Sequence, residues 1–305
     1  MDTILYPDFL EDITSFQAAS DFWQVKLESF YYWLYRIPNS LFPTMIHITK
    51  PPHPFLQSYI KSYWYLDAPF SNPGLQTTVM PEHALYFYPK AKVRADYADN
   101  TTKLHSTIIC IPNQDLPIMS WNGHYVMLKV LFHPTGFFRL FGIPMSSFGS
   151  RAIETIEVFG SEFKELYERI EESAGFEQMK SLLDAFFLKK AQTPLKDTLA
   201  IDAAIHSMLE LTVFSSVDEA AKNAYLSTRQ FERNFIERVG ILPKRFSRIV
   251  RFSQAMKLKQ EHPEYSWMTI AYECGYHDHM HLLRDFKHFT SKVPSNFDFE
   301  QALIY

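Results

Sequence analysis

Ten basic side chains lie close together in the C-terminal part of the chain. Only Glu232 and Glu237 oppose them, so this segment has an excess of eight positive charges, although the whole chain has a formal net charge of −4. Lys and Arg are the side chains that neutralise phosphates along a nucleic acid. Such a run of charge is usually a solvated helical surface. Whether it binds nucleic acid therefore depends on the secondary-structure elements in which these residues lie. The basic residues are Lys222, Arg229, Arg233, Arg238, Lys244, Arg245, Arg248, Arg251, Lys257 and Lys259.

Histidines near the C-terminus raise the question of a metal site. His277, His279, His281 and His288 lie close to Cys274 in the sequence. Residues two apart on a helix point in different directions, and neither a carboxylate nor a second cysteine completes a tetrahedral set. We therefore expect no metal and no cofactor. The chain also lacks GxSxG, P-loop and GxGxxG motifs, so we expect that it is not an enzyme.

The last ninety or so residues repeat themselves. A shift of fifty-one positions, without a gap, places many residues on identical or similar ones. Agreement over this length indicates that one supersecondary unit is used twice. The matched pairs are Ala220 with Ala271, Tyr225 with Tyr276, Phe231 with Leu282, Arg233 with Arg284, Phe235 with Phe286, Pro243 with Pro294 and Phe246 with Phe297.

Each copy has the pattern of a helix, a tight turn and a second helix, which is typical of a helix-turn-helix. In the first copy, Ser227 can cap the second helix by accepting a hydrogen bond from its free N–H groups, and Gly240 ends that helix. In the second copy, Gly275 lies in the turn and Asp278 caps the helix that follows. We place the units at about 217–239 and 268–290, joined by a helix at about 243–260.

Length and composition set the frame for these units. A chain of 305 residues favours roughly two domains, and 47% hydrophobic residues suffice for packed cores. The two cysteines, Cys110 and Cys274, cannot form a disulfide framework, which suits a reducing compartment. The N-terminus has no signal-peptide pattern, and no apolar stretch is long enough to cross a membrane. We expect a cytoplasmic protein.

The part of the chain before the repeat has a different pattern. Short runs rich in β-branched and aromatic residues, broken by Pro and Gly, predict a small β-barrel or sandwich with flanking helices. Five aromatic side chains could line an apolar pocket there, although such residues are more often plain core: Trp64, Tyr86, Tyr88, Trp121 and Phe132. The predicted fold is thus an α+β N-terminal domain followed by an all-α domain. Its boundaries are 1–44 for a helical extension, 45–192 for the β-rich domain and 197–305 for the all-α domain.

The repeat resembles the DNA-binding domain of AraC/XylS-type transcriptional regulators. GYHDHMHLLRDFKHFTSKVPSNF, at 275–297, is similar to the second helix-turn-helix of that family, and 217–246 is similar to the first. The resemblance covers about 199–300. One departure is Ser291, where the family usually has Gly, and we expect a slightly strained or differently shaped helix end there. Segments within 45–192 resemble, more weakly, an N-terminal sensing domain of some regulators of this family. The resemblance implies that this part of the chain binds an effector or mediates dimerisation.

The resemblance implies that one monomer reads two successive major grooves of double-stranded DNA, each with a second helix. It implies a contact to a base or a nearby phosphate at both Arg233 and Arg284, where the planar guanidinium suits guanine. The positions expected to face bases are Thr228, Arg229, Glu232, Arg233, His279, Met280, Leu283 and Arg284. Those expected to face phosphates are Lys244, Arg245, Arg248, Lys287 and Lys292.

Further partners follow from the resemblance alone. They are RNA polymerase, a small-molecule effector of unknown identity at the N-terminal domain, and a second copy of the chain. Two alternatives to a sequence-specific regulator stay open. One is an architectural helical module that binds DNA or protein without sequence preference, and the other is an enzyme that acts through the N-terminal domain. Salt dependence separates the first from a specific binder, and turnover of a ligand would reveal the second.

Overall fold

The computed structural model describes residues 46–69, 71–77, 79–109, 117–149, 151–192, 199–210, 216–297, 299 and 302–303. Apart from residue 299, these residues belong to one compact unit that comprises 44–297 and 302–305. The helical extension predicted for 1–44 lies outside the described residues. None of the described helices combines the length and apolarity needed to cross a membrane.

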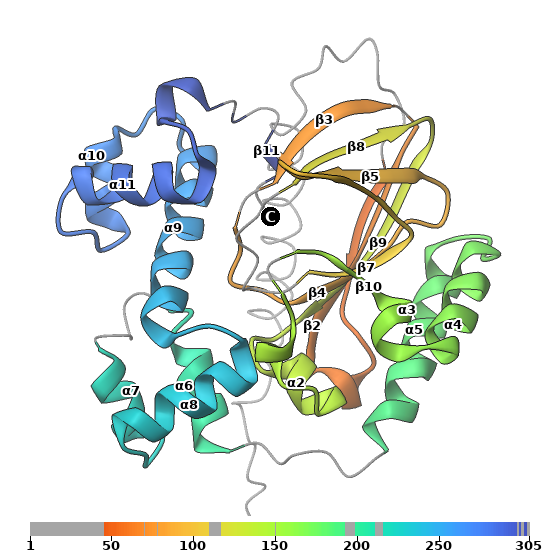
Figure 1. Ribbon diagram of the computed structural model, residues 1–305, viewed down its shortest axis with the longest axis horizontal. Helices are drawn as coiled ribbons and strands as arrows, with labels where there is room; N and C mark the ends of the chain where they lie inside the picture. Colours follow the sequence, from red (N-terminus) through yellow and green to blue (C-terminus); the bar gives the residue numbers. More distant parts are fainter. Residues whose placement is uncertain are drawn as a thin grey trace, which may run out of the picture. The chain divides into compact units, whose positions relative to one another are not determined.

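Two β-sheets and four helices make up the N-terminal half, which comprises the described residues of 46–192 and takes in the short strand β11 from the C-terminal end, as the sequence predicted for its β-rich domain (Figure 1). The first sheet has the strand order β1-β2-β9-β4-β7-β10, and the second has the order β11-β3-β8-β5-β6. Short helical turns η1 and η2 lie at Pro54–Leu56 and Met145–Ser147. The strands are β1 (Ile46–Lys50), β2 (Ile60–Ala68), β3 (Asn72–Thr77), β4 (Ala84–Phe87), β5 (Lys92–Asp96), β6 (Thr101–Leu104), β7 (Ser106–Ile109), β8 (Ile118–Asn122), β9 (Tyr125–Phe132), β10 (Ile153–Glu154) and β11 (Ala302–Leu303).

Side-chain alternation gives the six-stranded sheet two different faces. Because successive residues of a strand point to opposite faces, Leu128 and Val130 of β9 enter a core shared with the helices, whereas Lys129 faces the other way. All eight residues of β9 are buried, so both faces of this central strand are covered. The helices that contribute to this half are α2 (Gly136–Phe141), α3 (Thr155–Phe159), α4 (Ser161–Glu171) and α5 (Phe176–Ala191).

The same alternation divides the aromatic residues that the sequence grouped into one pocket. Phe132 belongs to the helical core, with its ring 5.3 Å from that of Phe137 and 6.0 Å from that of Phe187. Tyr86, on the strand next to β9, has its ring 5.5 Å from the Lys129 ammonium on the opposite face. Phe132 therefore does not line a pocket with the others, because strand periodicity points it toward α2 and α5.

The described residues from 199 to 297 are helical or lie in turns, as predicted for the all-α domain of 197–305. The prediction was wrong at Ala302–Leu303, which forms β11 and pairs in parallel with β3, because such a short strand depends on a distant partner. The helices of this C-terminal half are α6 (Ala200–Ser207), α7 (Val217–Asn223), α8 (Thr228–Val239), α9 (Pro243–Glu261), α10 (Trp267–Glu273) and α11 (His279–Thr290). The predicted caps are present: Ser227 accepts from the N–H of Gln230, and Asp278 accepts from the N–H of His281. The helix α9 runs between the pairs α7–α8 and α10–α11 (Figure 1).

The register of the repeat differs from the ungapped match. Ser216 and Ser266 cap the first helix of each pair, and the N–H groups of Leu226 and Tyr276 donate to the carbonyls of Ala221 and Ala271. These equivalent residues are fifty positions apart, whereas the second helices, α8 and α11, begin fifty-one positions apart. The second turn therefore contains one additional residue. The pairings of Ala220 with Ala271 and of Tyr225 with Tyr276 were wrong for this reason.

Ser291 takes the same backbone conformation as Gly240, its equivalent in the first copy of the repeat. Its φ of 58° lies in the left-handed region, as does the φ of 86° at Gly240, and both residues follow the last turn of their helix. The N–H of Ser291 donates to the carbonyl of Lys287, and the N–H of Gly240 donates to that of Ile236. The two helices thus end in the same backbone conformation. The expected strain lies at Ser291, because a positive φ is unfavourable for a residue with a side chain.

Gly136, the first residue of α2, leaves no space for a side chain. A Cβ atom placed there would lie 1.9 Å from the carbonyl oxygen of Tyr59, which is backbone and cannot turn away. The same oxygen accepts a hydrogen bond from the N–H of His133 at 3.0 Å, so the turn between β9 and α2 is fixed to the start of β2. This close approach of two backbones holds α2 against the sheet.

We expect Gly136→Ala to lower the free energy of unfolding by about 2–4 kcal/mol, because the added methyl group forces two backbones apart. Urea unfolding measures the change. The matched control is Gly149→Ala, since a Cβ at Gly149 meets no atom within 4 Å and its φ is not in the left-handed region. Equal stability of the two variants would contradict the close packing of α2.

Candidate nucleic-acid interface

The helix α8 has one buried side and one exposed side. Phe231 and Phe235 are fully buried, and the ring of Phe235 lies 5.5 Å from that of Phe246 on α9. Of the four positions expected to face bases, Thr228, Arg229 and Arg233 are exposed and Glu232 is half-buried. Thr228 donates a hydrogen bond to Asp218 of α7 at 2.7 Å, so its hydroxyl also fixes the two helices of the unit to each other.

The helix α11 repeats this division. Leu282 and Phe286 are fully buried, with the Phe286 ring 5.8 Å from that of Phe252 on α9. Met280 and Arg284 are exposed, whereas His279 and Leu283 are half-buried. A methionine that is 50% exposed at the start of a helix offers an apolar contact to whatever binds there.

Arg233 and Arg284 are the sixth residues of α8 and α11, so they occupy the same place on two equivalent helices. Both side chains are exposed. An exposed guanidinium offers a planar set of five N–H donors, which matches the two acceptors on the major-groove edge of guanine. The helices α8 and α11 therefore present one chemical group twice.

The residues expected to face phosphates fall into two groups. Lys244, Lys287 and Lys292 are exposed, as a phosphate contact requires. Arg245 and Arg248, on α9, are half-buried, and burial together with the charge of Arg248 lowers the pKa of Arg245. Lys244 is the second residue of α9, where it reaches solvent next to the turn that leaves α8.

Arg248 forms an ion pair that the sequence did not indicate. Its Nη2 donates to Oδ1 of Asp285 at 2.6 Å and its Nε donates to the same oxygen at 3.2 Å. Asp285 is buried on α11, with only 1% of its surface exposed, and its other oxygen accepts from the Tyr276 hydroxyl at 3.4 Å. The pair fixes α11 to α9. A phosphate contact by Arg248 stays a prediction.

The basic run as a whole is less exposed than its sequence implied. Arg238 is only 5% exposed, and its Nε lies 3.3 Å from Oδ1 of Asp202 on α6. Lys259 donates to the carbonyls of Pro263 and Tyr265, both at 2.7 Å. These cations stabilise the domain itself. No local pattern marks the burial of Arg238, because its partner Asp202 lies thirty-six positions earlier in the chain.

The histidine cluster has no metal-site geometry. Among the described residues, no group of three or more His, Cys, Asp or Glu side chains could hold a metal ion. Cys274 is buried, and burial raises the pKa of its thiol to about 11, which disfavours the thiolate that a metal needs. His281 instead packs edge-on against Tyr276, with ring centroids 5.3 Å apart, and His277 pairs with Asp278 at 3.3 Å.

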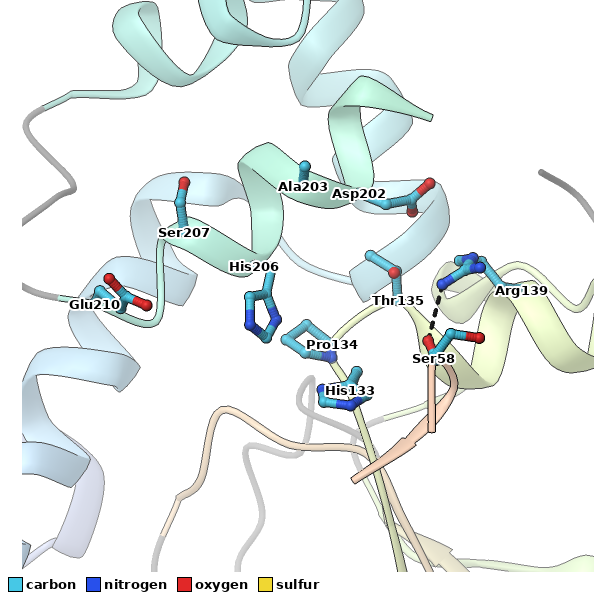
Figure 2. Close-up of a pocket in the computed structure, with 10 residues that line it drawn as sticks. All are labelled: Ser58, His133, Pro134, Thr135, Arg139, Asp202, Ala203, His206, Ser207 and Glu210. Atoms are coloured by element: carbon cyan, nitrogen blue, oxygen red, sulfur yellow. Dashed lines mark hydrogen bonds between the residues drawn. The ribbon is translucent and has the colours of Figure 1, made fainter. Parts of the chain in front are cut away.

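A cavity of about 440 Å³ lies between α6 and the turn that joins β9 to α2 (Figure 2). The rings of His133 and His206 meet edge to face there, with centroids 5.5 Å apart. Burial, and next the charge of His206, lowers the pKa of His133. Arg139 donates to the carbonyl of Ser58 at 2.9 Å, and Asp202 lines the same cavity.

Two parts of the chain match known protein families. Residues 220–298 match a family described as a helix-turn-helix domain, which covers α8, α9, α10, α11 and most of α7. Residues 48–154 match a family described as a domain of unknown function. No curated protein sequence matches the chain.

Solved structures of similar fold include ToxT from Vibrio cholerae O395, with 12% identity, a TM-score of 0.42, and coverage of 80% of this chain and 98% of that one. Wild-type ToxT from Vibrio cholerae strain SCE256 with an unsaturated fatty acid bound has 12% identity, a TM-score of 0.42, and coverage of 83% and 95%. The AraC-like transcriptional activator CuxR has 10% identity, a TM-score of 0.18, and coverage of 78% and 69%.

We expect Arg248→Met to lower the free energy of unfolding by about 2–3 kcal/mol, because it leaves Asp285 buried without a cation, although the partial exposure of Arg248 moderates the loss. The matched control is Arg284→Met on the exposed side of α11, which we expect to change stability by less than about 0.5 kcal/mol. Urea unfolding measures both, and equal losses would show that the buried pair has no special role.

Proposed function

We propose that this chain is a transcriptional regulator of the AraC type and that it recognises a specific DNA sequence by placing α8 and α11 in two successive major grooves. The observation that carries the proposal is the equivalent, exposed placement of Arg233 and Arg284 on two helices that are otherwise anchored by buried phenylalanines. Successive major grooves on one side of B-DNA lie about 34 Å apart, and α9 would hold the two helices at that separation.

Within this proposal the exposed residues divide by role. Arg233 and Arg284 would donate to base edges, and Met280 would touch a thymine methyl group. Thr228, Arg229, Glu232, His279 and Leu283 complete the surface proposed to face bases, and the half-buried members of this set would contribute with the exposed parts of their side chains. Lys244, Lys287 and Lys292 would contact phosphates, with Arg245 and Arg248 beside them, and so supply affinity rather than sequence choice.

The sharpest test of the division of roles compares Arg284→Ala with Lys244→Ala in the full chain. We expect Arg284→Ala to weaken binding to the selected DNA by about 1–3 kcal/mol and to relax the preference at one base pair, because it removes a base contact. Lys244→Ala should weaken all sequences alike and reduce the salt slope by about 1. Titrations at several salt concentrations, on selected and on random DNA, measure both quantities.

Lys103→Ala, on the exposed edge strand β6 of the N-terminal half, is the matched control and should leave DNA binding unchanged. Equal losses on selected and random DNA for both Arg284→Ala and Lys244→Ala would contradict the proposed roles. A wild-type chain that selects no sequence, and whose affinity falls smoothly with salt, would instead support the architectural alternative. The match of residues 220–298 to a helix-turn-helix domain supports a DNA-binding role rather than an enzymatic one.

We further propose that the N-terminal half binds an anionic effector at Lys129. This lysine is only 2% exposed, and its ammonium lies 3.6 Å from Oε2 of Glu82 and 4.8 Å from the ring centre of Trp64. Burial lowers the pKa of Lys129, while the Glu82 carboxylate opposes that change. In this proposal the carboxylate of the effector would replace that of Glu82 beside the Lys129 ammonium, and its apolar body would pack against the rings of Trp64 and Tyr86, on the face of the sheet turned away from the helical core.

The effector proposal is tested with an aromatic carboxylate such as benzoate as the probe. We expect saturating probe to raise the melting temperature of the wild-type chain, because a ligand that binds only the folded state stabilises it. The rise should be lost in Lys129→Met and kept in Lys103→Met, which removes an exposed lysine of the same half. The same rise in all three proteins would contradict the assignment of Lys129.

Two other partners complete the proposal. RNA polymerase would be the protein partner of a DNA-bound regulator of this type, and a second copy of the chain would bring a second pair of reading helices to a longer site. Both partners, like a cytoplasmic location, follow from the role of such a regulator.

A further inference from the structure

Arg238 joins the first reading helix to the N-terminal half. It lies on α8, yet its guanidinium carbon is 5.1 Å from the ring centre of Phe138 on α2. The same guanidinium has its Nε 3.3 Å from Oδ1 of Asp202 on α6, and its Nη1 donates to the carbonyl of Asn234 at 3.4 Å. One buried side chain thus contacts three helices, of which α2 belongs to the N-terminal half.

The position of Arg238 depends on all of these partners at once. A guanidinium is expensive to bury, so a 5% exposed arginine needs its carboxylate and its aromatic neighbour in place. Asp202 is itself fixed, because its Oδ2 accepts a hydrogen bond from the N–H of Leu199 at 2.8 Å at the start of α6. Phe138 is fully buried in the core of the N-terminal half. A displacement of α2 would therefore expose or separate a buried charge on α8.

The second reading helix is anchored differently. Its ion pair joins the buried Asp285 to the half-buried Arg248 on α9, so both partners lie within the C-terminal half. The guanidinium carbon of Arg248 also lies 5.6 Å from the ring centre of Phe289, which belongs to α11. Each of the two helices thus has an arginine–carboxylate pair, and in the part of the chain that the structure describes the pair on α8 also packs against the N-terminal half, whereas the pair on α11 does not.

We propose that Arg238 is a positioning residue that couples the orientation of α8 to the N-terminal half, whereas α11 is oriented by Arg248 within the C-terminal half. The inference rests on the proposed DNA recognition and adds an asymmetry to it. A change of state in the N-terminal half would alter the bases read by α8 and leave those read by α11 unchanged. Arg238 contacts no base in this scheme, because its side chain is buried.

The test selects bound sequences from a random DNA pool with the full-length protein. Arg233→Ala and Arg284→Ala first assign the two half-sites, since each removes the preference that its own helix imposes. We then expect Phe138→Leu and Arg238→Met to reduce discrimination in the α8 half-site by about fivefold to tenfold and to leave the α11 half-site unchanged. Asp285→Asn, which weakens the pair with Arg248 and removes no proposed DNA contact, is the matched variant, and it should do the reverse.

Arg238→Lys provides the conservative replacement, and it should restore part of the discrimination because it keeps the charge next to Asp202. Loss spread equally over both half-sites in the Arg238 and Phe138 variants, or unchanged selection in folded variants, would overturn the coupling.

Hydrogen exchange of the free protein tests the coupling without DNA. Phe138→Leu should speed amide exchange in α8 but not in α11, and Asp285→Asn should speed exchange in α11 but not in α8. Equal effects on both helices would overturn the inference even if DNA recognition stands. If the wild-type chain selected no sequence, the proposed function would fail, while the exchange result would still decide whether Arg238 couples α8 to the N-terminal half.

Discussion

The helix α9 has to support α8 and α11 at once, and the rest of the C-terminal half follows from that constraint. Its buried side takes Phe235 of the first unit through Phe246 and Phe286 of the second unit through Phe252. The helices α8 and α11 can each bury only one side in this way, so their outer sides stay in solvent. The equivalent exposure of Arg233 and Arg284 is a consequence of these two packing contacts.

Local rules let the sequence predict much of this structure. A cap acts over three residues, so Ser227 and Asp278 marked the starts of α8 and α11 correctly. The left-handed helix end at Gly240 was equally local, and Ser291 shows that the turn geometry persists when the glycine is absent. The two-part fold followed from the change between strand-like and helical periodicity.

Contacts between distant residues could not be predicted. The additional residue in the second turn was not predicted, because the ungapped comparison of the two copies still paired identical residue types there, as at Tyr225 and Tyr276. Arg238 was counted with the exposed cations because its partner Asp202 lies on another helix and Phe138 lies in the other half of the chain. Charge alone does not distinguish a solvated arginine from one that holds two helices together.

Guanine-methylation interference tests the central claim most directly, because a methyl group on N7 blocks major-groove contacts. The full chain on its selected site should give two clusters of interfering guanines about 10 base pairs apart, one lost in Arg233→Ala and the other in Arg284→Ala. A single cluster, or clusters that neither substitution removes, would contradict the reading of two successive grooves by α8 and α11.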